Sequence, residues 1–412
     1  MIFSTYWFLI FLPAVLGLYY LGRFYYVKSC VLAFASLVFY YHFTGPEGII
    51  PIAVLGVATY FIGLSKNKWL LYFGMFACVL SLIFYKYLLF LALSINKFLP
   101  SGSLIEVSSY SNIIAPLAIS FFTFEFIHYL YDVKVGAKPI KSPLDFLHFA
   151  MFFPTLAAGP IKRFESFLPS LHGALKSTSI PYHSFQYGLI RFLTGFIKKI
   201  AADSLALYVG SECLGSSFLD CTLQYRWIVF ASIAFRIYLD FSGYSDMAIG
   251  VAAMLGIKVP ENFNWPYLST SLTEFWRRWH ISLSSWIRDY LYIPLGGNRV
   301  SAPRHAANLL IVFLICGLWH GASWNFIAWG GYHGIGLVFE GFLVWLIGLW
   351  LPTFQRKFLT CLPASITKAS EYLMIALRWV LTTFFVWTGW LLFFYSPDQA
   401  WLMFLGLLGQ RP

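Results

Sequence analysis

The feature that most constrains this chain is a succession of long apolar runs with few charges. A helix that crosses the hydrocarbon core of a bilayer needs about 20 apolar residues. Only 11% of the 412 residues are charged, whereas ordinary soluble domains carry about 25%. Lipid must therefore solvate much of the surface. We predict an all-α integral membrane protein with roughly ten or eleven transmembrane or re-entrant helices, from runs near residues 2–21, 29–43, 49–64, 69–95, 113–131, 146–160, 186–210, 226–256, 307–322, 324–351, 372–395 and 398–408.

Three of these runs have features that refine the prediction. The first is apolar up to Leu21 and its first basic residue follows it, the reverse of a secretory signal, so we expect a retained membrane helix. The run 146–160 contains Pro154 and ends in Gly-Pro, which indicates a broken or re-entrant helix. The run 186–210 carries charges and suits an interfacial or tilted helix. We see no internal repeat and predict one polytopic domain, 1–412.

The net charge of +11 has two explanations in a membrane protein. Lys and Arg gather in cytoplasmic loops, and this alone accounts for the excess. Part of the charge could also serve an anionic substrate. The expected partner of the surface is the lipid bilayer, and no nucleic acid is expected.

Polar residues concentrate between Arg236 and His333, where burial in a membrane makes them costly. Arg236 and Asp240 are four residues apart and are expected to pair along one helix face. Asp246 has no basic residue three or four positions away, so its partner must come from another segment. Asp246 is therefore the better candidate for orienting a catalytic group. Gly243 and Gly250 predict a close approach by another helix.

The segment 271–290 reads as one amphipathic helix. Ser271 and Glu274 form a capping box, and Glu274 is expected to pair with Arg278. One face is aromatic and apolar, and a second carries Arg277, His280, Ser284 and Arg288. A surface helix explains the apolar face, but it explains less well a histidine between two arginines. Two guanidinium groups would lower the pKa of His280, and arginines suit phosphate.

The strongest single feature is His320, which follows an apolar run and precedes another. A lone histidine in an apolar helix is more often structural than functional. Gly317 and Gly321 would leave room beside this one, and Trp319 and Trp324 could wall a pocket. The unperturbed pKa of histidine, near neutrality, suits a general base. His333 is expected to be structural. No spacing of His280, His320 and His333 supports a metal site.

Several segments together resemble the membrane-bound O-acyltransferase (MBOAT) superfamily, in particular its bacterial branch, typified by the membrane subunit of alginate O-acetylation. They occupy 116–334, and further likenesses at both ends extend the resemblance over nearly the whole chain. The matching segments are Pro116-Leu-Ala-Ile-Ser-Phe-Phe-Thr-Phe124, Phe152-Phe-Pro-Thr-Leu-Ala-Ala-Gly-Pro160, Asp240-Phe-Ser-Gly-Tyr-Ser-Asp246, Glu261-Asn-Phe-Asn264, Phe275-Trp-Arg-Arg-Trp-His280 and Gly317-Leu-Trp-His-Gly321.

The resemblance implies an MBOAT core, its motif-bearing part at 116–334, with helices around a central funnel or tunnel near His320. It places the family's histidine on His320 and its second polar position on His280. It also implies a cytoplasmic thioester donor, which we expect to be acetyl-CoA, and an extracytoplasmic acceptor. Supporting residues would be Asp246, Trp279, Trp319 and Asn325, and candidates for binding the donor's phosphates are Lys162, Arg163, Arg277 and Arg288. No tightly bound cofactor or metal is expected.

The function expected on this basis is O-acetylation of a cell-surface polysaccharide from the bacterial cytoplasmic (inner) membrane. His320 would act as general base or acyl carrier, and an extracytoplasmic SGNH-type protein would complete the transfer. The chain ends at Pro412, before two helices usual in the alginate branch, which suggests a shorter relative, such as a peptidoglycan O-acetylation subunit, or a truncated form. Two alternatives remain: transfer of D-alanine to teichoic acid, and a non-catalytic transporter, against which the lack of a repeat argues.

Overall fold

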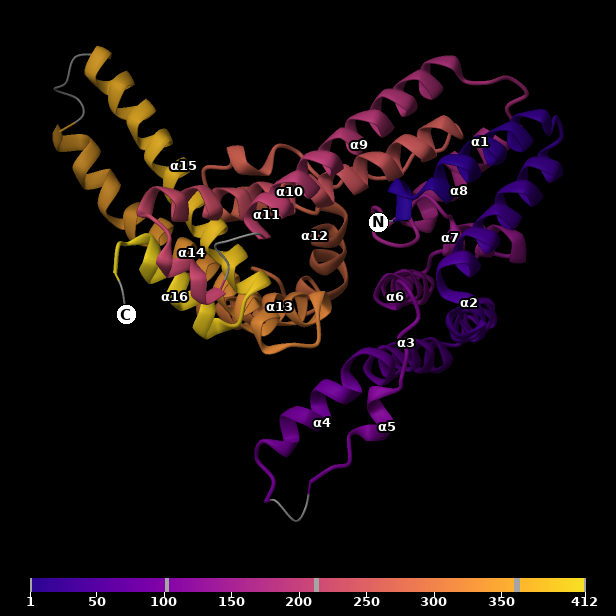
Figure 1. The fold of residues 1–412 in the computed structure, drawn as a ribbon, viewed down its shortest axis with the longest axis horizontal. Coiled ribbons are helices and arrows are strands. Elements are labelled where there is room, and N and C mark those ends of the chain that lie inside the picture. The colour runs from indigo at the N-terminus through magenta and orange to yellow at the C-terminus, as the bar shows by residue number, and fades with distance from the viewer. Residues whose placement is uncertain (1, 101–103, 211–214, 359–363, 411–412) are drawn as a thin grey trace. The chain divides into compact units, whose positions relative to one another are not determined.

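The structure, a computed structural model, describes residues 2–100, 104–210, 215–358 and 364–410. These residues are α-helical apart from turns, short 3₁₀ and π segments and one isolated bridge between Phe263 and Trp279 (Figure 1). They form two compact units. Unit 1 is Met1–Ile200 with Asp240–Glu261, and unit 2 is Ala201–Leu239 with Asn262–Pro412. Helices α9 (Tyr182–Gly210) and α10 (Leu223–Met254) contribute to both units.

Unit 1 contains the amino-terminal helices. Helix α2 (Tyr25–Ser65) is interrupted at Gly45, whose φ of 63° lies in the left-handed region, so the two apolar runs expected at 29–43 and 49–64 are two helical segments joined at a kink. Asn67 caps α3 by accepting from the amides of Trp69 and Leu70. The elements of unit 1 that precede α9 are η1 (Ile2–Ser4), α1 (Tyr6–Leu21), α2 (Tyr25–Ser65), α3 (Lys68–Leu82), η2 (Ile83–Tyr87), α4 (Leu88–Asn96), α5 (Ser108–Ser111), α6 (Ile119–Val135), α7 (Pro143–Met151) and α8 (Phe164–Lys176).

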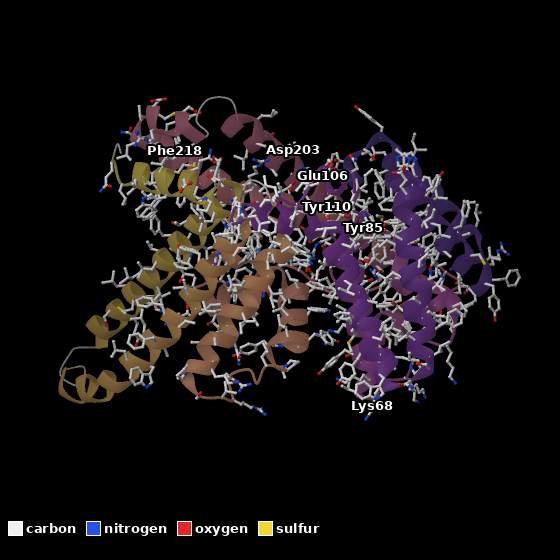
Figure 2. All side chains as sticks on the ribbon, turned by 90° about the horizontal axis from the view of Figure 1, so that it is seen from below. Lys68, Tyr85, Glu106, Tyr110, Asp203 and Phe218 are labelled. Atoms are coloured by element: carbon white, nitrogen blue, oxygen red, sulfur yellow. The ribbon has the colours of Figure 1, made fainter. Side chains whose placement is uncertain are left out.

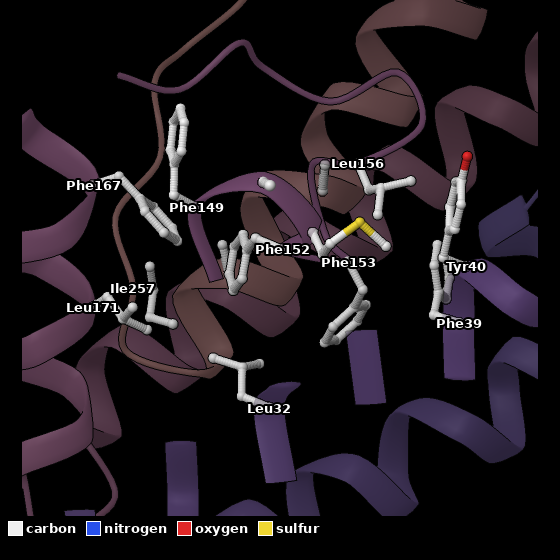
Figure 3. Packing of buried hydrophobic residues seen from close by; sticks show 14 of the residues in the cluster. Leu32, Phe39, Tyr40, Phe149, Phe152, Phe153, Leu156, Phe167, Leu171 and Ile257 are labelled. Atoms are coloured by element: carbon white, nitrogen blue, oxygen red, sulfur yellow. The ribbon is translucent and has the colours of Figure 1, made fainter. Parts of the chain in front are cut away.

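The core of unit 1 is built around the break predicted in the run 146–160. Helix α7 ends at Met151, and the chain continues in turns that contain Pro154. Phe152 and Phe153 of these turns are fully buried and lie among side chains of α2, α8 and the segment after α10 (Figure 3). The turns after α7 therefore contribute large aromatic side chains to the core of unit 1.

Helices α9 and α10 pack closely in unit 1 through pairs of glycines. A Cβ at Gly195 would lie 2.5 Å from the carbonyl oxygen of Gly243, and one at Gly250 would lie 2.6 Å from that of Gly188. The close approach predicted from Gly243 and Gly250 is confirmed, and α9 is the helix that approaches.

We expect Gly195→Leu to destabilise unit 1 strongly, because its side chain would meet backbone, which cannot rotate away. Overpacking of a well-packed core typically costs about 1–3 kcal/mol, and sometimes more. Gly17→Leu in α1 is the matched control, since a Cβ there has no heavy atom within 4 Å. Thermal unfolding of the purified protein in detergent measures both. Equal losses in the two variants would contradict the packing described here.

Unit 2 carries the carboxy-terminal helices. Buried Arg226 of α10 donates to the carbonyls of Leu219 and Gly406 and so fixes the last helix. The other elements are η3 (Gly215–Asp220), η4 (Pro266–Leu268), α11 (Leu272–Arg278), α12 (Ile281–Ile287), η5 (Arg288–Tyr292), α13 (Ala302–His320), α14 (Trp324–Phe358), α15 (Ala364–Phe394) and α16 (Pro397–Leu407).

Four of the described helical stretches are long and apolar enough to cross a bilayer: Tyr25–Ser65, Lys68–Asn96, Ala302–His320 and Ser370–Phe394. Helix α1 is apolar but shorter. Exposed large apolar side chains are numerous in both units, as lipid contact requires. The chain is an all-helical membrane protein, while the number of spans stays a prediction.

Candidate active site

Three histidines of unit 2, His280, His320 and His333, gather around two tryptophans and are called here the histidine cluster. The His320 ring centroid lies 4.9 Å from that of Trp319 and 5.0 Å from that of Trp329. Trp319 also faces His280 at 5.9 Å, and Trp329 faces His333 at 5.0 Å. Residues more than 50 positions apart in the chain therefore share one aromatic site.

The three members differ in how far a bound molecule can reach them. His280 is 1% exposed and His333 is 0% exposed, whereas His320 is half-buried. His320 is the last residue of α13, because Gly321 turns to an extended conformation. Its position at a helix end and its partial exposure are compatible with a residue that contacts a substrate. His333 is enclosed by aromatic rings, including those of Trp276 and Phe385, as expected of a structural residue.

The continuous helix predicted over 271–290 is wrong. Helix α11 ends at Arg278 and α12 begins at Ile281. Between them His280 has a φ of 44°, a left-handed conformation that non-glycine residues adopt rarely and mainly where the surrounding structure imposes it. The break removes the predicted line of Arg277, His280, Ser284 and Arg288 from a single helix face, and the His280 ring is buried.

The segment after Glu261 holds His280 in this conformation. The carbonyl of Asn262 accepts from the Ile281 amide at 2.9 Å, and its side-chain oxygen accepts from the Ser282 hydroxyl at 2.6 Å. The Asn264 amide donates to the carbonyl of Arg278 at 3.0 Å. Asn262 is fully buried. This short antiparallel pairing fixes the backbone on both sides of His280 and presents the ring to Trp319.

The pKa of His280 is held well below its usual value of 6.5, first by burial and second by the charge of a protonated His320. The predicted direction of this pKa shift is therefore confirmed, but the predicted cause, two arginines, is wrong. A histidine with a lowered pKa is neutral at pH 7, so it has one nitrogen that donates and one that accepts. Such a ring can donate a hydrogen bond to a developing oxyanion without carrying charge itself.

The pocket wall around His320 differs from the prediction. A Cβ at Gly317 would lie 2.2 Å from the Phe326 carbonyl oxygen, and one at Gly321 would lie 2.2 Å from the Phe326 ring. The space beside these two glycines is occupied by Phe326 of α14. The prediction that they leave free space beside His320 is therefore wrong. Trp319 contacts the His320 ring, and its role as a pocket wall stays a prediction, whereas Trp324 is 49% exposed at the start of α14.

Two aromatic rings that contact His320 were not predicted from the sequence. They belong to Trp329 and Phe393. The Phe393 ring lies 5.1 Å from that of His320. The side-chain amide of Asn325 donates to the Phe393 carbonyl at 3.2 Å, so Asn325 joins α14 to α15 next to the His320 ring contact. Trp279 is 3% exposed and packs 4.8 Å from Trp390. The helical period of α14 could have identified Trp329, because it lies four residues before His333.

Glu340 of α14 anchors α11, which leads to His280. Its carboxylate accepts from the amides of Leu272 and Thr273 and, at 2.6 Å, from the Thr273 hydroxyl. Ser271 caps the same helix by accepting from the Glu274 amide, as predicted. The reciprocal half of the predicted capping box is wrong, because the Glu274 carboxylate accepts from the Thr270 amide at 2.8 Å instead of the Ser271 amide. Glu274 pairs with Arg278 at 2.6 Å, also as predicted.

We expect Glu340→Gln to lower the stability of unit 2 by about 1–3 kcal/mol, because the hydrogen bonds at the α11 amino terminus lose their charged acceptor. Thermal unfolding measures the loss. Glu371→Gln on the exposed surface of α15 is the control and should unfold at the wild-type temperature. An unchanged midpoint in Glu340→Gln would show that this anchor contributes nothing.

The four residues predicted to bind donor phosphates are placed differently. Lys162, in unit 1, is 1% exposed, and its amine lies 2.6 Å from the Glu125 carboxylate. A phosphate would have to displace Glu125 to reach it. Arg163 is half-buried beside it, before α8, and Arg277 is exposed on α11 in unit 2. Arg288, also in unit 2, is exposed and pairs with Asp289 at 2.7 Å. Their role in binding a donor stays a prediction.

Asp246 lies in unit 1, where its carboxylate accepts from Arg191 and from Lys198, each at 2.6 Å. Its partners come from α9, which confirms that they lie in another segment. The expected pair of Arg236 and Asp240 is wrong: Asp240 pairs with Lys199 at 2.6 Å. Arg236 instead lies 5.5 Å from the centre of the Phe394 ring. The orienting role proposed for Asp246 remains untested.

Among the described residues, no group of three or more His, Cys, Asp or Glu side chains has an arrangement that could hold a metal ion. The histidine cluster, although it brings three rings to one place, is therefore organised by aromatic contacts.

Comparison with known proteins identifies the family to which the chain is similar. Residues 130–396 match the model of the membrane-bound O-acyltransferase family. The chain is 38% identical to the "Probable alginate O-acetylase" of Azotobacter vinelandii over 99% of this chain and 78% of that protein. It is 38% identical to the "Peptidoglycan O-acetyltransferase" of Helicobacter pylori over 74% of this chain and 63% of that protein. The "Teichoic acid D-alanyltransferase" of Streptococcus thermophilus is 28% identical over 92% of each chain.

Proposed function

The chain belongs to the membrane-bound O-acyltransferase family and is an acyltransferase, and we propose that it acetylates a cell-surface polysaccharide. Two of the similar proteins are O-acetylases by name, one acting on alginate and one on peptidoglycan. The donor we propose is acetyl-CoA on the cytoplasmic side, and the acceptor is an extracytoplasmic hydroxyl. The location proposed is the bacterial inner membrane.

The observation that carries the mechanism is the half-buried His320 beside the buried, neutral His280. In the first form of the mechanism, the acceptor hydroxyl gives its proton to His320 as its oxygen attacks the thioester carbonyl. The tetrahedral oxyanion would accept a hydrogen bond from the N–H of His280. The intermediate then collapses to the ester, and the CoA thiolate leaves and takes up the proton from His320.

The second form makes His320 the acyl carrier. The unprotonated nitrogen of the neutral His320 ring attacks the thioester, and the thiolate leaves and takes up the proton from the other ring nitrogen. The resulting neutral acyl-imidazole passes its acetyl group to the hydroxyl, whose proton returns to the imidazole. In both forms the reacting groups meet at a ring that contacts Trp319, Trp329 and Phe393, and these apolar surroundings would disfavour hydrolysis of the thioester. The exposed Arg277 and Arg288 are the candidates in unit 2 for the donor's phosphates.

An extracytoplasmic SGNH-type protein is the partner we propose for the last step. Hydroxyls of a polymer outside the membrane cannot all reach a pocket inside it, so a secreted carrier that accepts the acetyl group and passes it on would extend the reaction. A deletion of such a partner should leave cleavage of acetyl-CoA by the purified chain intact while removing acetyl ester from the polymer.

One alternative has specific support. The similar D-alanyltransferase matches the present chain over 92% of both lengths, so D-alanyl transfer from a carrier protein to teichoic acid is the second candidate. Family membership as an acyltransferase argues against the other alternative, a transporter that only moves its substrate.

Parallel reactions with radiolabelled acetyl-CoA and with radiolabelled D-alanyl carrier protein separate the two candidates. We expect membranes that contain the chain to release CoA and transfer acetyl label, and to leave the D-alanyl thioester intact. Consumption of the D-alanyl thioester without use of acetyl-CoA would replace acetylation by the second candidate.

A further inference from the structure

A buried lysine with no role in the proposed chemistry lines a cavity in unit 1. Lys28, in the first turn of α2, is 2% exposed. Its amine donates to the carbonyl of Ser177 at 2.6 Å and lies 4.9 Å from the centre of the Tyr19 ring. Among the residues that the structure describes, no carboxylate pairs with Lys28. A buried ammonium normally has a carboxylate or several acceptors around it, so this one has spare capacity for an anion.

The cavity beside Lys28 has the size and the polarity for a small anionic group. Its volume is about 190 Å³, far above the roughly 10–15 Å³ that a single water molecule needs. The lining includes the hydroxyl-bearing residues Tyr20, Ser177 and Ser179 and the small residues Gly173 and Gly256, with no acidic residue. The ammonium has three hydrogens, of which Ser177 takes one. Two donors therefore remain for a ligand oxygen.

The surroundings of the cavity favour a ligand that is part of the membrane. Apolar side chains next to its lining residues are widely exposed: Leu21 at 78%, Phe24 at 74%, Ile180 at 55% and Tyr182 at 68%. Two further cations, Arg23 and Lys176, are exposed in the same two segments of the chain. A phosphate with apolar chains attached would satisfy the buried ammonium and cover the exposed apolar surface together.

We infer that the Lys28 cavity binds a phosphate group, of which the phosphodiester of an anionic phospholipid is the source that best fits these surroundings. The phosphate oxygens accept from the Lys28 ammonium. The hydroxyls of Tyr20 and Ser177 donate to the carbonyls of Met254 and Ser179, so the Ser179 hydroxyl is the lining group that donates to a remaining phosphate oxygen. Free inorganic phosphate offers the same charge without the apolar chains, so the two sources can be separated by experiment.

The test is the thermal unfolding midpoint of the full-length, delipidated protein in detergent, measured with phosphatidylglycerol, with phosphatidylcholine and with inorganic phosphate. We expect phosphatidylglycerol to raise the midpoint by several degrees more than phosphatidylcholine does. Lys28→Met should abolish this difference, because the methionine has a similar shape without the charge. Lys68→Met is the control, since Lys68 is the exposed first residue of α3 in the same unit (Figure 2).

A second variant keeps the test decisive if Lys28→Met does not fold. A Cβ at Gly173 meets no heavy atom within 4 Å, so Gly173→Leu places a side chain in the cavity without a clash and leaves Lys28 in place. We expect it to fold as well as the wild type and to weaken binding of phosphatidylglycerol at least tenfold.

Each outcome of the test decides the inference. A shift by inorganic phosphate that both variants abolish would support the site and identify free phosphate as its ligand. No shift with either phosphate source, or a shift that Gly173→Leu retains, would overturn the inference. None of these outcomes depends on acyl transfer.

Discussion

Replacing His320 by Ala is expected to lower acyl transfer at least about 100-fold, the range over which a general acid–base group contributes. The loss follows in both forms of the mechanism, because either a proton or the acyl group must pass through this ring. The measurement is the release of CoA thiol from acetyl-CoA by the purified protein in the presence of an acceptor.

The fold should survive this substitution. His320 is half-buried at the last position of α13, so a smaller side chain opens the pocket without leaving a buried cavity. His305→Ala is the matched control, since His305 is a half-buried histidine of the same helix with no place in the cluster. The account is contradicted if His320→Ala turns over at the wild-type rate, or if His305→Ala loses as much activity.

The same protein can distinguish the two forms of the mechanism. A brief exposure to radiolabelled donor without acceptor should label the wild-type chain if His320 carries the acyl group. Transfer that proceeds without any labelled protein would identify His320 as the general base.

The second large effect is expected from Gly330→Ala in α14. A Cβ at Gly330 would lie 2.2 Å from the carbonyl oxygen of Phe313 in α13, so α13 and α14 must separate. His320 ends α13 and Trp329 precedes Gly330, so the separation displaces the pocket itself. A displacement of about 1 Å can lower a rate about 100-fold, and we expect losses of both stability and activity.

The neighbouring position supplies the control for Gly330. At Gly331 the nearest heavy atom to a Cβ is a Leu314 methyl carbon at 3.7 Å, an ordinary contact. Gly331→Ala should therefore match the wild type in unfolding midpoint and in turnover. The helix packing described here would be contradicted if Gly330→Ala behaved like Gly331→Ala.

The parts of this site that were predictable from the sequence are those set by local patterns. His320 was identified because a titratable residue in an apolar helix is costly. Ser271 was identified as an N-cap because its side chain satisfies a nearby amide. The close approach at Gly243 followed from the absence of a side chain. Each of these depends on residues within a few positions, or on the residue type alone.

The parts that were not predictable depend on distant segments. The pattern of 271–290 fits a helix throughout, and only the pairing of Asn262 and Asn264 with the residues around His280 breaks it. Helical spacing suggested that Asp240 would pair with Arg236, but Lys199 of α9 takes that place. No local rule shows which of these two cations will lie closer to Asp240 after the helices have packed.

Gly317 shows a different reason for a wrong prediction. A glycine beside a candidate catalytic residue can provide space for a ligand or contact with another helix, and the sequence is the same in both cases. Here the Phe326 backbone occupies the space. Phe393 was missed for a related reason, because α15 is about 70 residues further along the chain and no motif connects the two.

The most direct test of the central claim is the amount of base-labile acetate on cell-surface polysaccharide in living cells. The host strain lacks its own copy of the gene and carries the wild type, His320→Ala or His305→Ala at equal membrane levels. We predict that the wild type and His305→Ala restore acetylation and that His320→Ala does not. Full acetylation with His320→Ala, or none with the wild type, would contradict the claim that this chain is a polysaccharide O-acetyltransferase whose chemistry depends on His320.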